Sequence, residues 1–247
     1  MLAVNAWTVF LAALVTAVAT GLGALPFLFV RRMSRRWLGI ANAIAAGLML
    51  AASFGLMAEG SVYSPGRTIF GILAGAAFIA LSHGLVAGRR DLHIGALRGA
   101  DALKALMIVG IMTVHSAAEG IGVGVAYGGG EQLGVFITAA IAVHNIPEGL
   151  AISLVLVPRG AGVWQAAGWS VFSSLPQPLL AVPAFLFVTV FQPFLPVGLG
   201  LAAGAMIWMA LAELIPDALE DLGGPTVAST VTASLGAMLA FQELLKG

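Results

Sequence analysis

Long runs of apolar residues, separated by short polar connections, occur along the whole chain. The hydrocarbon core of a bilayer is about 30 Å thick, so a helix that crosses it needs about 20 predominantly apolar residues. Eight runs are of this kind, and each is typical of a transmembrane helix. We expect them near residues 5–28, 37–58, 68–88, 102–127, 132–157, 163–190, 195–219 and 226–244.

The connections are too short to hold a soluble domain, so we expect residues 1–247 to form a single transmembrane domain. The predicted fold class is an all-α integral membrane protein with eight transmembrane helices. Composition agrees, because 60% of the residues are hydrophobic and only 9% are charged, whereas a soluble domain carries about 25% charged residues. The net charge of +0 and the lack of a basic patch predict no nucleic-acid partner.

Lysine and arginine lie mainly on one side of the predicted bundle. Nine follow spans one, three, five and seven, against Arg67 and Lys246 on the other side. Loops on the cytoplasmic side are enriched in Lys and Arg. We therefore expect a multi-pass protein of the cell (inner or plasma) membrane with both termini outside. The nine are Arg31, Arg32, Arg35, Arg36, Arg89, Arg90, Arg98, Lys104 and Arg159.

Two neighbouring spans carry the same polar motif, His-[Ser/Asn]-x-x-Glu-Gly. It places His115 and Glu119 in "TVHSAAEGIGVGV", and His144 and Glu148 in "AVHNIPEGLAISL". Residues four apart lie about one helical turn apart on one face. Both motifs lie near mid-span on oppositely directed helices, so the two pairs are expected to meet near the bilayer midplane. This pattern indicates an inverted-repeat-like arrangement around the fourth and fifth helices.

Two imidazoles and two carboxylates form a ligand set for a divalent cation. Four nitrogen and oxygen ligands suit Zn²⁺, and Fe²⁺ or Mn²⁺ fit when waters join. Two glutamates cancel the charge of the cation, which matters in a medium that disfavours net charge. A single intramembrane histidine is more often a hydrogen bonder between helices, but two copies at matched depth favour a metal site.

Small residues and a proline accompany the motifs. Gly120 and Gly124 form a small-xxx-small pair, and with Gly122 and Gly149 they are expected to let helices approach closely. Pro147 lacks the N–H that would reach the carbonyl four residues earlier, so it is expected to kink the fifth span beside the site.

Two later spans carry further polar residues. Span six contains "FSSLPQPLLAVP", which predicts a broken helix whose Ser173, Ser174 and Gln177 serve either the site or hydrogen bonds between helices. Span seven contains "LAELIPDALEDLGG", where Glu213 and Asp217 lie four apart near the cytoplasmic end. They predict either an inner exit site or a solvated helix end. His83 and His93 are interpreted as isolated histidines.

"HSAAEG" followed on the next span by "HNIPEG" resembles the ZIP (zinc/iron permease, Zrt/Irt-like) family of divalent-metal transporters, prokaryotic type. "SSLPQPL" and "AELIPD" extend the resemblance along the whole chain. It implies a homodimeric α-helical transporter that carries Zn²⁺, and also Fe²⁺, Mn²⁺ or Cd²⁺, into the cytoplasm. It also implies a primary metal site formed by His115, Glu119, His144 and Glu148.

Some members of that family hold a second metal beside the first. They use an Asn after the first His, an Asn or Asp after the second, and a Glu in span six. This chain has Ser116, Asn145 and Gln177 at these positions. All three are neutral, so a second divalent cation would leave uncompensated charge in a medium of low dielectric constant. We therefore predict one cation per protomer.

Two other function classes compete with transport. An intramembrane zinc metalloenzyme is the main alternative, because zinc held by His and Glu also activates water. The sequence has no H-E-x-x-H motif and no obvious spare buried acid to act as a general base. A metal-gated sensor would need a soluble output domain, which the spans leave no room for.

Overall fold

The computed structural model describes residues 4–30, 33–87 and 100–246, and in these ranges every regular element is helical. The elements are α1 (Ala6–Leu22), η1 (Leu25–Leu28), α2 (Arg35–Tyr63), α3 (Pro65–Ala87), α4 (Ala100–Gly129), α5 (Glu131–Leu156), η2 (Val157–Arg159), α6 (Val163–Ser174), α7 (Pro176–Val190), η3 (Gln192–Phe194), α8 (Leu195–Met209), η4 (Ala210–Leu214), α9 (Ile215–Asp221) and α10 (Gly224–Lys246).

Eight segments of the described chain are long and apolar enough to cross a membrane, which confirms the predicted eight-span all-α fold. Spans six and seven are each built from more than one helix. In span six α6 ends at Ser174 and α7 begins at Pro176, as the broken-helix interpretation predicts. In span seven a π-helical turn, η4, joins α8 to α9. The proline in α5, Pro147, does not end that helix.

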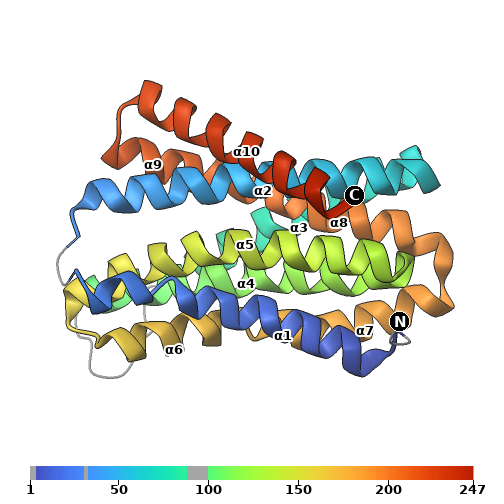
Figure 1. Ribbon diagram of the computed structural model, residues 1–247, viewed down its shortest axis with the longest axis horizontal. Helices are drawn as coiled ribbons and strands as arrows, with labels where there is room; N and C mark the ends of the chain where they lie inside the picture. Colours follow the sequence, from blue (N-terminus) through green and yellow to red (C-terminus); the bar gives the residue numbers. More distant parts are fainter. Residues whose placement is uncertain (1–3, 31–32, 88–99, 247) are drawn as a thin grey trace.

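The helices lie roughly side by side along the long axis of the molecule (Figure 1). Antiparallel α4 and α5 lie in the middle. On one side of them α1 packs against α5 and α7 packs against α4, while on the other side α2 packs against α10 and α3 against α8. The start of α1 and the end of α10 lie toward the same end of the bundle, as an even number of spans requires.

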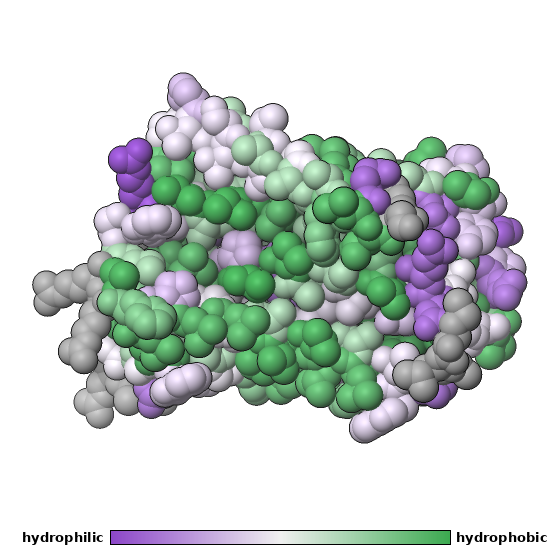
Figure 2. Space-filling model, in the orientation of Figure 1, coloured by the Kyte–Doolittle hydropathy of each residue, from purple (hydrophilic) through white to green (hydrophobic). Residues whose placement is uncertain are grey.

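The outer surface is strongly apolar. Trp7, Leu11 and Val15 project from one face of α1, and Phe70 and Leu73 project from α3; all five are exposed. Figure 2 shows hydrophobic residues over most of the middle of the visible face and hydrophilic ones gathered near its right-hand end. Exposed apolar side chains on this scale fit a surface that faces lipid rather than water.

The charge asymmetry of the loops stays a prediction. Arg31, Arg32, Arg89, Arg90 and Arg98 lie outside the described residues, as does His93, and the side chain of Lys104 is not described. Elsewhere, Arg35 at the start of α2 pairs with Asp221 at the end of α9, with 3.0 Å between Nε and Oδ1.

Glycines bring the central helices close to their neighbours, as the small-xxx-small pattern predicts. A Cβ added at Gly124 would lie 2.0 Å from the carbonyl oxygen of Ala181, and one at Gly120 would lie 2.5 Å from that of Gln177. The backbones of α4 and α7 therefore touch at both positions. This contact places the side chain of Gln177 beside the polar face of α4.

Candidate metal centre

The two His/Glu motifs meet between α4 and α5. His115 and Glu119 come from α4, His144 and Glu148 come from α5, and all four side chains are buried. One ligand atom from each residue can be chosen so that the four lie within 4.8 Å of one another. Each helix contributes its pair from one face, as the spacing of four residues requires.

The contacts within this cluster lie both within each helix and between the two helices. Nε2 of His115 lies 3.2 Å from Oε1 of Glu119 and 3.2 Å from Oε1 of Glu148. Nε2 of His144 lies 2.5 Å from Oε1 of Glu119 and 4.0 Å from Oε1 of Glu148. The same nitrogen of each imidazole and one oxygen of each carboxylate therefore face a common centre. The Nδ1 atoms have no hydrogen-bond partner among the described residues.

Burying two carboxylates side by side, as this cluster does, is electrostatically unfavourable unless their charge is balanced. Two carboxylates removed from water repel each other, and buried charge is stable only when it is paired or bound to a cation. A divalent cation at the common centre would balance both carboxylates and use both imidazoles as neutral ligands. The four ligands, and the way their atoms converge, thus fit Zn²⁺.

Two of the three residues at the positions where some family members hold a second metal make hydrogen bonds beside this cluster. Gln177 Nε2 donates a hydrogen bond to Oε2 of Glu119 at 2.5 Å. Asn145 Nδ2 donates to the carbonyl oxygen of Thr16 at 2.9 Å and to Oε1 of Gln177 at 3.3 Å. Ser116 is buried on α4 beside His115. Asn145 and Gln177 are therefore joined to the cluster by hydrogen bonds.

The polar residues of span six make two kinds of contact. Gln177 contacts Glu119, whereas the hydroxyl of Ser174 lies 2.8 Å from that of Thr20 on α1 and links two helices. Ser173 donates to the carbonyl oxygen of Ser170 within its own helix.

Thr16 of α1 also contacts this group, although it is not among the residues predicted from the sequence. Its hydroxyl lies within hydrogen-bonding reach of both Oε1 of Gln177 and the carbonyl oxygen of Ala13. The available signal was the pair Thr16 and Thr20, four residues apart in the otherwise apolar stretch 9–23, which puts two hydroxyls on one face.

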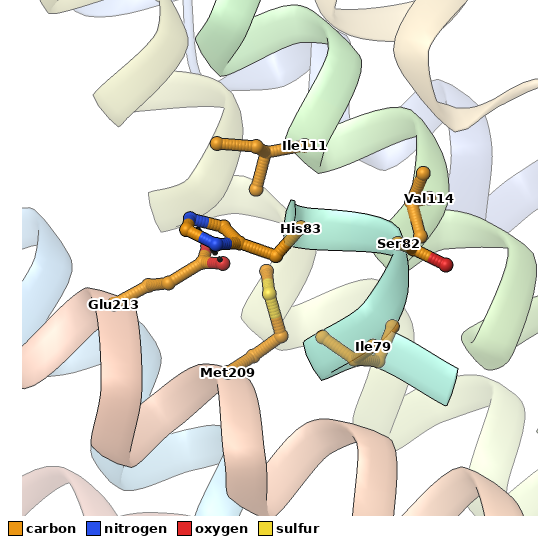
Figure 3. Close-up of a pocket in the computed structure, with 7 residues that line it drawn as sticks. All are labelled: Ile79, Ser82, His83, Ile111, Val114, Met209 and Glu213. Carbon is orange, nitrogen blue, oxygen red and sulfur yellow. Dashed lines mark ion pairs between the residues drawn. The ribbon is translucent and has the colours of Figure 1, made fainter. Parts of the chain in front are cut away.

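Glu213 and Asp217, the two residues of the predicted inner exit site, have different surroundings in the structure. Glu213 lies on η4 with Oε1 3.5 Å from Nε2 of His83 on α3, so the interpretation of His83 as isolated is wrong (Figure 3). Asp217 lies one turn further along, on α9, and is exposed. The pair His83 and Glu213 lines a small pocket together with Ile79, Ser82, Ile111, Val114 and Met209.

This pocket is close to the cluster, because Val114 directly precedes His115 on α4. The π-helical turn that carries Glu213 inserts an extra residue into the turn, and such turns occur frequently at functional sites. Neither the turn nor the pair with His83 has a signature in the local sequence.

Comparisons with known proteins agree with the geometry. The family model described as "ZIP Zinc transporter" matches residues 90–241. Zinc transporter GufA of Myxococcus xanthus is 31% identical, with 93% of this chain and 94% of that protein covered. Zinc transporter ZIPB of Bordetella bronchiseptica is 33% identical, with 92% and 76% covered.

A plant relative, At3g08650 of Arabidopsis thaliana, is 49% identical over 98% of this chain, which spans 40% of the length of that protein. The two bacterial proteins, in contrast, align over most of their own length. Together with the family model, which matches more than half of the chain, these relatives show the family. The chain belongs to the ZIP family of zinc transporters.

Proposed function

We propose that this protein carries Zn²⁺ across a cell membrane into the cytoplasm through the cluster of His115, Glu119, His144 and Glu148. The observation that carries the proposal is the convergence of four buried ligand atoms within 4.8 Å, supplied by two antiparallel membrane-spanning helices. The names of the aligned relatives, which are those of zinc transporters, support it.

The chemistry of the cluster suits a substrate ion that must bind and leave. Two imidazoles and two carboxylate oxygens give Zn²⁺ its preferred four-coordinate set. The same nitrogen and oxygen ligands accept Fe²⁺, Mn²⁺ and Cd²⁺ when waters or other geometries are allowed, and we propose these ions as weaker substrates. Imidazole ligands must be neutral and carboxylates ionised, so protons compete with the ion for the cluster.

An intramembrane zinc metalloenzyme is the alternative, and it is disfavoured because the family and its aligned relatives are named as transporters. Purified protein reconstituted into liposomes that contain a zinc-sensitive dye would separate the two. We expect Zn²⁺ added outside to reach the dye faster than in protein-free liposomes. Tight zinc binding without any flux would contradict transport.

The proposed direction rests on the loop charges, which put both termini outside. Because the chain has no cysteine, single cysteines report topology cleanly. On intact cells, the introduced cysteine of the Gly247→Cys variant should react with an impermeant maleimide. That of the Arg90→Cys variant should react only after permeabilisation. The reverse pattern would mean that the termini face the cytoplasm.

We further propose that Glu213 and Asp217 form an inner exit site, with His83 as a third member. Glu213 and His83 line a pocket beside the cluster, and exposed Asp217 follows one turn later. Replacing Glu213 and Asp217 with Gln and Asn should slow Zn²⁺ uptake while leaving equilibrium zinc affinity at the cluster nearly unchanged. An equal loss of affinity, measured by calorimetry, would place Glu213 in the central site instead.

The assembly and location belong to the same proposal. The resemblance to the family implies a homodimer, and the apolar outer surface fits residence in a bilayer of the cell (inner or plasma) membrane. Light scattering of the purified protein, corrected for detergent, should give the mass of two chains. The mass of one 25.1 kDa chain would contradict the dimer.

A further inference from the structure

A chain of hydrogen bonds reaches Glu119 from α1 through α5 and α7. It begins at the backbone carbonyl of Thr16, which can only accept. Asn145 therefore presents its NH₂ group there, 2.9 Å away, and the same nitrogen lies 3.3 Å from Oε1 of Gln177. The amide nitrogen of Gln177 then faces Oε2 of Glu119 at 2.5 Å.

The carbonyl of Thr16 fixes which group donates and which accepts at each step of this series of hydrogen bonds. If the Gln177 amide were rotated by half a turn, its NH₂ group would face the NH₂ group of Asn145, and its oxygen would face a carboxylate oxygen. Two favourable contacts would become two repulsive ones. Amide orientation is assigned from such networks, and here a backbone acceptor anchors the assignment. Gln177 thus donates to Glu119 in the only arrangement that satisfies its neighbours.

Because of this hydrogen bond, the two carboxylate oxygens of Glu119 have different partners. Oε1 faces both imidazoles, at 3.2 Å from His115 and 2.5 Å from His144. Oε2 is held by Gln177 on the other side of the carboxylate. Asn145 and Gln177 are fully buried, so no bulk water competes for these contacts. One oxygen of Glu119 is therefore available to a cation at the cluster, and the other is occupied.

We propose that Gln177 is a positioning residue that holds Glu119 as a one-oxygen ligand and restricts the centre to a single cation. The inference rests on the proposed function, since it concerns the same cluster. A second cation that shared Glu119 with the first would bind its Oε2, where it would meet the partly positive NH₂ group of Gln177. The amide thus disfavours a shared second cation by its position as well as by its lack of charge.

The first test replaces Gln177 with leucine, which keeps much of the volume and removes the donor. Loss of an outer-sphere partner costs about 10- to 100-fold in metal affinity, and we expect a fall in Zn²⁺ affinity of that size by calorimetry on purified protein. Freed Oε2 should also join the metal and raise its coordination number. With Co²⁺ as the probe, the intense visible absorption of a four-coordinate ion should weaken.

Gln242→Leu is the matched control, because Gln242 is another buried glutamine, on α10 beside Gly55 of α2. This variant should keep wild-type affinity and the wild-type Co²⁺ spectrum. Wild-type affinity and spectrum in Gln177→Leu would overturn the inference. Absence of Zn²⁺ and Co²⁺ binding in the wild type, in contrast, would contradict the proposed function itself.

The second test uses Gln177→Glu, which keeps the length of the side chain and replaces the donor with a carboxylate. Two carboxylates in contact should recruit a second cation, so zinc content measured by mass spectrometry should rise from one toward two per chain, more so with Ser116→Asn added. This variant also tests the proposed role of Gln177 if the Gln177→Leu variant does not fold. Two zinc ions in the wild type, or one in Gln177→Glu, would overturn the inference.

Discussion

Replacing Glu119 or Glu148 with alanine is expected to abolish Zn²⁺ uptake while the protein still inserts into the membrane. Each change removes a ligand and half of the negative charge that balances the cation. The loss should exceed the roughly 10- to 100-fold that removal of an outer-sphere partner costs. His115→Ala and His144→Ala should also reduce uptake strongly, because each removes a nitrogen ligand whose Nε2 faces the cluster.

Uptake of radioactive zinc by cells with matched amounts of each variant measures this effect. Glu220→Ala is a suitable control, since Glu220 is an exposed carboxylate on α9. It should transport at the wild-type rate. Near-normal uptake by both the Glu119 and the Glu148 variant would mean that the ion crosses elsewhere.

The second large effect concerns Gly149, the residue that follows Glu148. A Cβ added there would lie 1.7 Å from the carbonyl oxygen of Thr20, where α1 crosses α5. Overpacking a well-packed interior typically costs about 1–3 kcal/mol, and here the obstacle is backbone that no rotamer change can move. Gly149→Ala should therefore destabilise the protein and push α1 away from the cluster.

Gly168→Ala provides the comparison, because Gly168 is also within a helix, α6, and no atom of a neighbouring helix lies within 4 Å of its added Cβ. Loss of the monodisperse peak in size-exclusion chromatography after heating reports the stability of each variant in detergent. Gly149→Ala should lose it at a lower temperature than the wild type, and Gly168→Ala should not. Equal stability of the two variants would show that α1 and α5 are not in close contact.

The sequence predicted the features that depend on spacing within one helix. Runs of about 20 apolar residues have few structures available in a bilayer besides a transmembrane helix, so all eight spans were recognisable. His115 with Glu119, and His144 with Glu148, were placed on common faces by helical periodicity alone. Gly120 and Gly124 likewise predicted the close approach that the structure places against α7.

The contacts that could not be predicted from the sequence join helices that are far apart along the chain. His83 and Glu213 come from α3 and the π-helical turn after α8, and no local pattern predicts that their side chains meet. The role of Gln177 was open for the same reason, because its partners Thr16 and Asn145 lie on two other helices. Helix-to-helix register decides such pairs, and it depends on packing over whole helices.

Anomalous scattering at the zinc absorption edge, from crystals grown with Zn²⁺, tests the four-ligand centre most directly. We expect one strong peak per chain between α4 and α5, at about 2.0–2.1 Å from Nε2 of His115 and of His144, and about 2.0–2.2 Å from an oxygen of Glu119 and of Glu148. A peak only elsewhere, or two well-occupied peaks about 4 Å apart as in paired metal sites, would contradict a single four-ligand centre.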